Sequence, residues 1–190
     1  LVEEIVFPER LVLLVKANRD QLTELLMSYD YLAEIRKARE PMNFLNTAAN
    51  AEQADWVEEL LNRMEVAEEV STSILVLETG INRGSRLLVT DLSEDDCYTY
   101  DEPWGTSDHQ GHGTEMAGLS LFGDLYDLIR VDSLIEVGHK LESGKILPPK
   151  GENEKHLYGS ITAQVISKAE TANPDLNRII CLAVSEEEDN

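Results

Sequence analysis

The chain of 190 residues is 42% hydrophobic and 28% charged, which is the composition of a soluble globular protein and excludes a disordered or fibrous one. Its 37 acidic and 16 basic residues give a formal net charge of -21, so phosphate backbones and anionic membrane surfaces are repelled, and we expect neither nucleic acid nor a membrane as a partner. No apolar run approaches the ~20 residues of a membrane span, and the first residues do not predict a signal peptide.

The first 66 residues predict a strand and two helices. The continuous apolar run 11–15 predicts a buried strand. Asn18, with a glutamine three residues later, predicts a capped helix whose apolar positions recur at helical spacing as far as Leu32. Asn50, again followed by a glutamine three residues on, predicts the start of a second helix with an apolar face that extends to Met64.

The middle of the chain predicts a central strand followed by a loop and a helix. The short apolar run 74–77 ends in Glu78, as expected for a parallel strand that is buried on both faces. The very acidic segment 92–101 predicts a loop. The apolar and small residues of 116–121 predict a helix packed on the sheet, with its N-terminus close to His112.

The last third alternates strands and helices. Strands are predicted at 134–137 and 145–147, and two prolines close the second because proline supplies no ladder donor. The stripe 158–169 predicts a helix, and 178–185 predicts one more buried strand. The succession implies a layered α/β fold with a mostly parallel sheet.

Two side chains stand where chemistry is expected. In an open α/β sheet, functional groups gather at the carboxyl ends of the strands, and Glu78 lies at such an end with Gly80 allowing the chain to turn away. His112 lies between two glycines, which leave room for its imidazole to meet a substrate. Together they predict an acid and base pair that awaits a third member.

These residues carry a resemblance to a known family. Residues 76–82, V-L-E-T-G-I-N, are similar to the subtilase acid motif V-L-D-T-G-I, and residues 108–118, D-H-Q-G-H-G-T-E-M-A-G, are similar to the histidine motif D-x-x-G-H-G-T-x-x-A-G. The order of the two motifs and the gap between them also suit that family. The chain thus resembles the N-terminal part of a subtilisin-like serine peptidase over roughly residues 73–185.

The resemblance implies a subtilisin-like three-layer α/β fold, truncated at its C-terminus, for residues 69–190. Residues 1–68 are then a small α+β extension, either a prodomain-like region or a family-specific addition. The family's centre implies that Glu78 orients His112, which takes the proton of a serine while an oxyanion hole holds the developing charge. The resemblance implies no metal and no other cofactor.

The resemblance also implies how a peptide or protein substrate binds. In subtilases, the strand that matches 179–185 borders the substrate cleft. Ala183, Val184 and Ser185 are therefore expected to be backbone partners of a bound peptide, in a mode like strand addition. Some intracellular bacterial subtilases are thought to work beside ATPase partners in defence, which makes an ATPase a family-level expectation for a partner.

Two departures from the family pattern bear on activity. Glu78 is one methylene longer than the family's aspartate, which moves the carboxylate by ~1.5 Å and predicts reduced activity unless the backbone or rotamer compensates. The family places its nucleophilic serine after the strand that here ends at Ser185. The only G-T-S string, 105–107, precedes the histidine. We therefore expect the fragment to be inactive alone and to need the remainder of the catalytic domain.

Other readings remain open. A catalytically inactive pseudopeptidase or peptide-binding module would keep the cleft and lose the chemistry. His109, His112 and Glu115, spaced by three, resemble a zinc-binding trio, but the intervening glycines disfavour a helix through all three.

The two cysteines bear on location. Cys97 lies in the acidic segment and Cys181 in an apolar run, which favours free thiols over a disulfide framework. We therefore expect a cytoplasmic protein.

Overall fold

The computed structural model describes residues 3–38, 47–67 and 69–184. The chain divides into two compact units, Leu1–Asn46 and Thr47–Asn190, and each has its own elements. The domain boundary expected at residue 68 stays a prediction. Within the described ranges, no helix combines the length and the apolar character needed to cross a bilayer.

The first unit opens with a hairpin of β1 (Glu3–Val6) and β2 (Leu11–Leu14), paired antiparallel. The strand predicted at 11–15 is present, but the prediction that it is buried is wrong, because all four residues of β2 are exposed. Neither face of a two-stranded hairpin is covered unless another layer packs on it. β1 was not predicted, since Glu3 and Glu4 interrupt its apolar pattern.

Helix α1 (Arg19–Ser28) has the predicted cap. The side chain of Asn18 accepts from the backbone N–H of Gln21 at 2.9 Å, and the side chain of Gln21 accepts from the backbone N–H of Asn18 at 2.9 Å. The helix ends before Leu32, the last position of the predicted stripe. No residue of α1 is buried, so no tertiary packing stabilises a further turn of the helix.

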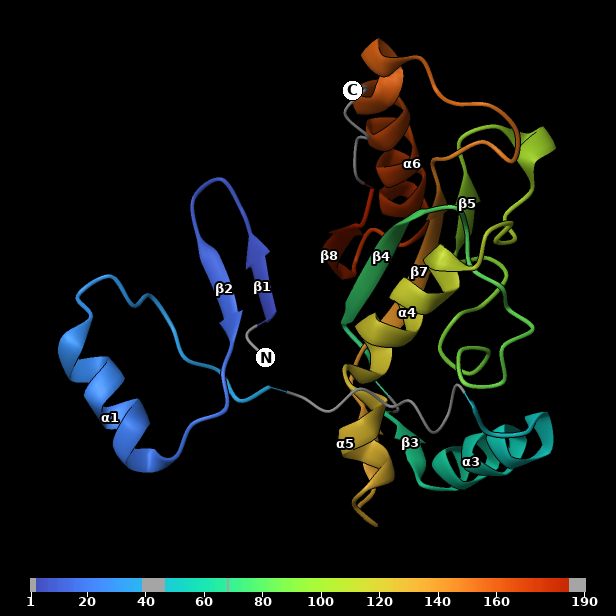
Figure 1. The fold of residues 1–190 in the computed structure, drawn as a ribbon. Helices are drawn as coiled ribbons and strands as arrows, with labels where there is room; N and C mark the ends of the chain where they lie inside the picture. The colour runs from blue at the N-terminus through green and yellow to red at the C-terminus, as the bar shows by residue number, and fades with distance from the viewer. Residues whose placement is uncertain (1–2, 39–46, 68, 185–190) are drawn as a thin grey trace. The chain divides into compact units, whose positions relative to one another are not determined.

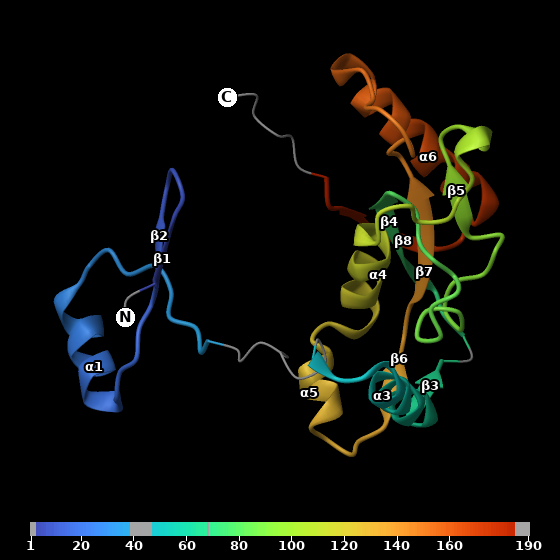
Figure 2. The same ribbon diagram turned by 45° about the vertical axis from the view of Figure 1, so that its right-hand side comes forward.

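The second unit begins with α3 (Asn50–Asn62), which was predicted, although Asn50 is its first residue and Ala49 is its cap. The expectation that the helix reaches Met64 is wrong. The chain leaves the helix at Arg63, whose guanidinium binds the carbonyls of Val131, Ser133 and Leu128 at 2.7–3.0 Å. β3 (Met64–Val66) then pairs parallel with β6 (Ile135–Val137). The short helix α5 (Leu125–Ile129) lies beside α3, as Figure 2 shows.

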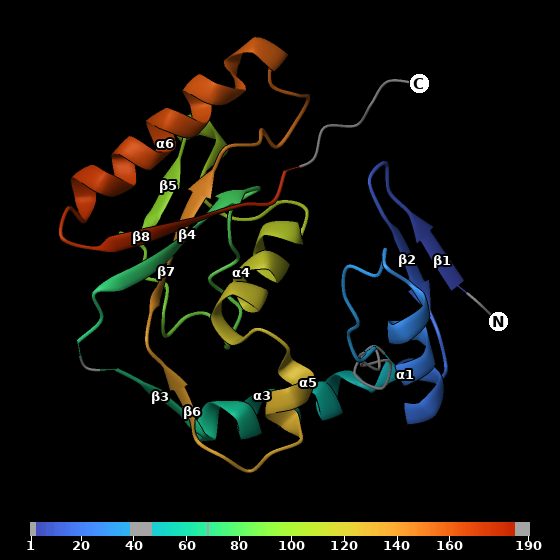
Figure 3. The ribbon, with the colours of Figure 1, turned by 90° about the vertical axis from the view of Figure 1, so that its left-hand side faces the viewer.

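The main sheet consists of four strands in the order β5-β7-β4-β8, all parallel. They are β4 (Thr72–Glu78), β5 (Cys97–Thr99), β7 (Lys140–Lys145) and β8 (Asn177–Leu182). Helix α4 (His112–Phe122) lies on one face and α6 (Tyr158–Ala172) on the other (Figures 1 and 3). Two short 3-10 helices, Glu102–Trp104 and Lys155–Leu157, complete the unit.

Strand β4 is the centre of the core. Its side chains alternate between faces, so Val76 packs with Ala117 on the α4 side, while Leu75 and Leu77 pack with Val165 on the α6 side. These side chains are at most 1% exposed. The predicted central strand buried on both faces is confirmed, and so is the α/β architecture with a mostly parallel sheet.

Strand β7 was placed five residues too late by the sequence, at 145–147 instead of Lys140–Lys145. The reason is that its middle is polar yet buried. Glu142 is 0% exposed and forms an ion pair with Arg178 at 2.6 Å. Gly144 is required by space, because a Cβ there would lie 2.5 Å from Leu77 and 2.7 Å from Val165. Apolar patterning does not detect such a strand.

Strand β5 corrects the prediction of a loop over the whole acidic segment 92–101. The acidic residue before the strand is not solvated. Asp96 is only 4% exposed, and its carboxylate accepts hydrogen bonds from Ser93, Lys140 and Asn173 at 2.9–3.1 Å. These partners neutralise the charge and allow Cys97–Thr99 to join the sheet edge beside β7.

Candidate active site

Glu78 is the last residue of β4, and the chain turns sharply away after it. The turn requires Gly80, whose φ of +98° belongs to the left-handed region that side chains avoid. A Cβ on Gly80 would also lie 2.3 Å from the carbonyl oxygen of Thr106. The segment that precedes the histidine motif therefore packs directly on this turn.

Glu78 and His112, the two side chains predicted as acid and base, meet. Nδ1 of His112 lies 2.9 Å from Oε1 of Glu78. The carboxylate is almost fully buried, whereas 48% of the imidazole is exposed. The other carboxylate oxygen accepts the backbone N–H of Thr79, which fixes the rotamer. The extra methylene of the glutamate is thus accommodated, and its catalytic use stays a prediction.

The hydrogen bond with Glu78 raises the pKa of His112, and the negative charges of Glu78, Glu115 and Asp108 add to the effect. A raised pKa means that the charged imidazolium is favoured in the folded protein. The bond uses Nδ1, and among the described residues Nε2 has no hydrogen-bond partner. The arrangement presents Nε2 as the nitrogen that can exchange a proton with a substrate group.

The N-terminus of α4 is held by Asp108, which sequence reasoning did not select. Its carboxylate accepts the backbone N–H groups of Gln110, Gly111 and Thr114 at 2.8–2.9 Å, and the hydroxyl of Thr114 at 2.6 Å. Burial alone would raise the pKa of Asp108, but these hydrogen bonds hold it well below its usual value. His112 is the first residue of α4, so Asp108 fixes the position of the backbone that carries the imidazole.

Thr79 and Gly113 join the strand end to the helix. The hydroxyl of Thr79 donates to Asp108 at 2.8 Å and accepts the backbone N–H of Gly113 at 3.2 Å. A Cβ on Gly113 would lie 2.1 Å from the carbonyl oxygen of Gly80. The histidine motif contains Asp108, Thr114 and Gly113, so the signal for these positions was present in the sequence although no role was assigned to them.

A cavity lies beside the N-terminus of α4. Its lining is polar and includes two acidic residues: Asn82, Asp108, His109, Gln110, Gly111, Thr114 and Glu115. Two of the three side chains of the zinc alternative, His109 and Glu115, are part of this lining, and the third, His112, bonds Glu78 instead. Across the residues with described positions, no three His, Cys, Asp or Glu side chains are grouped to hold a metal.

The predicted peptide-binding residues follow β8. Leu182 pairs in register with Leu77, so Ala183 follows one residue further, beside the level of Glu78. Val184 is partly buried against the core on the α6 side. Ser185 lies outside the described residues. The structure thus brings Ala183 to the strand ends where Glu78 lies, and peptide binding there stays a prediction.

The G-T-S string at 105–107 does not place a serine hydroxyl on His112. The carbonyl of Ser107 accepts a hydrogen bond from Lys145 at 2.6 Å, and within the described part of the chain no serine hydroxyl is hydrogen-bonded to His112. The segment has a supporting position under the turn at Gly80.

Comparison with known proteins agrees with this geometry. A family model described as the subtilase family, a family of serine peptidases, matches residues 70–190, which is more than half of the chain and includes Glu78, His112 and all of the main sheet. Neither the curated proteins nor the solved structures include a significant match. The chain belongs to the subtilase family.

Proposed function

We propose that this chain provides the acid and the general base of a subtilisin-type serine endopeptidase. The observation that carries the proposal is the 2.9 Å contact between Nδ1 of His112 and Oε1 of Glu78 at the carboxyl end of a central parallel strand. Family membership supports the reaction class, hydrolysis of peptide bonds.

The chemistry assigns one role to each side chain. Nε2 of His112 takes the proton of a serine hydroxyl, whose oxygen forms a bond to the scissile carbonyl carbon. Glu78 stabilises the resulting imidazolium through Nδ1 and holds the ring in one orientation. His112 then gives the proton to the leaving amine as the peptide bond breaks, and water hydrolyses the acyl-enzyme in a second cycle of the same proton transfers.

We propose that the serine comes from the remainder of the catalytic domain, as a partner of these residues. Strand β8 supports this. Ile179 and Ile180 point to opposite faces of the sheet, yet each is about half exposed. A strand of a parallel sheet is normally covered on both faces, so β8 has the surface that further strands and helices would cover.

We propose that a peptide substrate lies along Ala183, Val184 and Ser185, where its main chain would give affinity and side-chain pockets selectivity. We also propose a cytoplasmic protein of the intracellular bacterial branch, with an ATPase as a further partner. Both cysteines are free, and burial raises the pKa of Cys97 to about 11, which keeps its thiol protonated and unreactive. Free thiols support a reducing compartment.

The test is peptide hydrolysis by the full-length protein with His112→Ala. We expect the loss of a triad member to reduce kcat by at least about 1,000-fold. His156→Ala is the control and should leave the rate unchanged, because that imidazole is exposed and, among the described residues, its ion pair is with Glu154, at 3.6 Å. Equal rates for the His112→Ala protein and the wild type would refute the proposal.

The rival function is a pseudopeptidase or peptide-binding module. Glu78 in place of aspartate is the feature that favours it. It predicts that the full-length protein binds peptides with unchanged affinity after His112→Ala and hydrolyses none of them. Measuring binding and hydrolysis on the same peptide library separates the two functions.

A further inference from the structure

Lys145 is a buried charge that the proposed mechanism does not use. It is 1% exposed and is the last residue of β7, paired in register with Glu78 on β4. Gly144 faces α6, where a Cβ would meet Leu77 and Val165. Because successive side chains alternate, Lys145 faces α4, on the same side of the sheet as Glu78.

The ammonium group of Lys145 binds two backbone carbonyls. Nζ donates to the carbonyl of Ser107 at 2.6 Å and to that of Trp104 at 3.2 Å. Burial lowers the pKa of this lysine, while the negative charge of Asp108 acts in the opposite direction. A buried cation is costly unless it is hydrogen-bonded and paired, and here its hydrogen bonds go to one short segment, residues 104–107.

That segment contacts the turn after Glu78 and leads directly into the residue that holds the helix of His112. Residues 106 and 107 pack on Gly80, where an added Cβ would lie 2.3 Å from Thr106 and 2.9 Å from Ser107. The next residue, Asp108, holds the N-terminus of α4 through its hydrogen bonds to Gly111 and Thr114. A displacement of the segment at Lys145 therefore changes where α4 begins.

We propose that Lys145 is a positioning residue, whose hydrogen bonds to Ser107 and Trp104 fix the segment that sets the distance between His112 and Glu78. The inference rests on the proposed function for its effect on catalysis and on the geometry alone for its effect on His112. Lys145 is too buried to touch a substrate, so it acts only through the segment.

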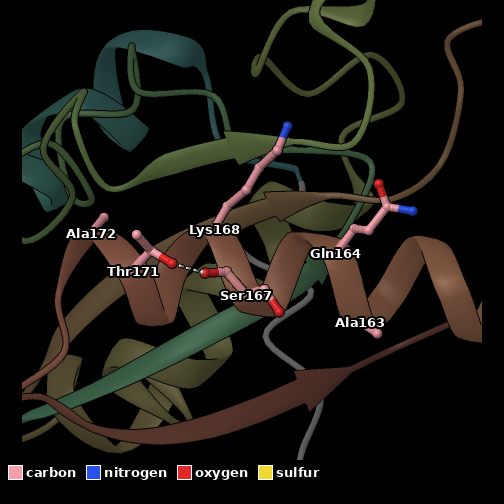
Figure 4. Close-up of a pocket in the computed structure, with 6 residues that line it drawn as sticks. All are labelled: Ala163, Gln164, Ser167, Lys168, Thr171 and Ala172. Atoms are coloured by element: carbon pink, nitrogen blue, oxygen red, sulfur yellow. Dashed lines mark hydrogen bonds between the residues drawn. The ribbon is translucent and has the colours of Figure 1, made fainter.

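A second lysine, exposed rather than buried, provides a control for the loss of this kind of contact. Lys168 points from α6 toward β5 (Figure 4), and its Nζ donates to the carbonyls of Thr99 at 2.7 Å and Tyr100 at 3.5 Å. It thus makes the same kind of contact, a lysine with two backbone carbonyls. Its helix, α6, lies on the opposite face of the sheet from α4 (Figure 3), and neither of its partners belongs to the segment 104–108.

The experiment compares Lys145→Met, Lys145→Arg and Lys168→Met in the full-length protein. The first readout is the pKa of His112, measured by NMR titration. We expect Lys145→Met to lower it toward the ordinary value of 6.5, because the Glu78 contact that raises it is lost. The second readout is peptide hydrolysis, where a displaced base should reduce kcat by about 100-fold with little change in KM.

Lys145→Arg keeps N–H donors at this position and should restore part of the wild-type pKa and kcat, whereas Lys168→Met should change neither. If Lys145→Met does not fold, Lys145→Gln, which keeps a shorter donor without the charge, replaces it in both readouts. An unchanged His112 pKa in a folded Lys145 variant overturns the inference. A shifted pKa in a protein that hydrolyses no peptide supports the inference and refutes the proposed function instead.

Discussion

At the scale of single residues, the length of the acid determines whether its carboxylate reaches the imidazole. A glutamate at position 78 was expected to misplace its carboxylate. Instead the side chain turns back so that one oxygen accepts the N–H of Thr79 and the other reaches His112 at 2.9 Å. The site is therefore fitted to glutamate, and an aspartate in the present backbone would stop short of the imidazole.

Glu78→Asp should accordingly reduce kcat/KM rather than raise it. A hydrogen bond to a charged group contributes about 1.5–3 kcal/mol, which corresponds to a decrease of roughly 10- to 100-fold. The pH profile should change as well. The base must be neutral to accept a proton, so we expect the acid limb of wild-type kcat/KM to lie above pH 6.5, the ordinary pKa of histidine. The weakened Glu78 contact should move this limb to lower pH.

The direction of the His112 pKa shift can also be tested through the pH dependence of folding stability, which needs no activity measurement. A His112 pKa that is raised in the folded protein stabilises it below the unfolded value of 6.5, and this stabilisation is lost as the pH rises through the folded pKa. Glu78→Gln keeps the length of the side chain and removes its charge, so it should weaken this pH dependence, and the smaller contributions of Glu115 and Asp108 should remain. For the activity prediction, an increased kcat/KM of Glu78→Asp would contradict the conclusion that the site is fitted to glutamate.

At the scale of elements, the contact between β4 and α4 depends on the absence of one side chain. Gly113→Ala would place a Cβ 2.1 Å from the carbonyl of Gly80, and the helix must move away from the strand end. We expect a destabilisation of about 1–3 kcal/mol, as for overpacked cores, with a loss of activity because His112 precedes Gly113. Urea unfolding and peptide hydrolysis measure the two effects.

Gly118 is the matched control on the same helix. A Cβ there meets nothing within 4 Å, so Gly118→Ala should stabilise α4 by about 0.5–1 kcal/mol, through the lower backbone entropy of the unfolded chain. Two glycine-to-alanine changes five residues apart are thus expected to change the free energy of unfolding in opposite directions. If both variants stabilise the protein, the close approach of α4 to Gly80 is wrong.

The same elements explain which parts of the fold the sequence predicts. β4 was predicted because its residues 74–77 form a continuous apolar run, and α6 because its apolar positions recur with the period of a helix. β7 was misplaced because two of its buried residues are not large apolar ones. Glu142 is buried because it pairs with Arg178, 36 residues away in sequence. Position 144 must be glycine because Leu77 and Val165 leave no room for a side chain. Neither reason is visible in local sequence.

The candidate site shows the same limit. Glu78 and His112 were found because a motif marks them and because strand ends gather functional groups. Lys145 was interpreted as the start of a strand that suits the family and was given no role of its own. Its role depends on the carbonyls of Trp104 and Ser107, which come close only in the folded chain. Contacts made by backbone groups leave almost no trace in sequence.

At the scale of the whole molecule, charge is unevenly distributed along the chain. Residues 47–190 carry 29 of the 37 acidic residues but only 10 of the 16 basic ones. Favourable pairs in the interior, such as Glu142 with Arg178, are shielded from solvent. The surplus carboxylates are mostly at the surface, where they repel one another and oppose the compact state.

Salt should therefore stabilise this protein at neutral pH. Raising NaCl from ~0.01 to ~0.15 M shortens the screening length from about 30 to about 8 Å, which weakens repulsion between exposed carboxylates and leaves the buried pairs almost unchanged. We expect a gain of ~1 kcal/mol, which raises the melting temperature by about 2–4 °C for a protein of this size. The measurement is a thermal scan across a salt series at pH 7, and its control is the same series near the isoelectric point of 4.4, where carboxylates are partly protonated and the increase should be much smaller. A melting temperature that falls with NaCl at pH 7 would mean that ion pairs, and not carboxylate repulsion, dominate the surface electrostatics.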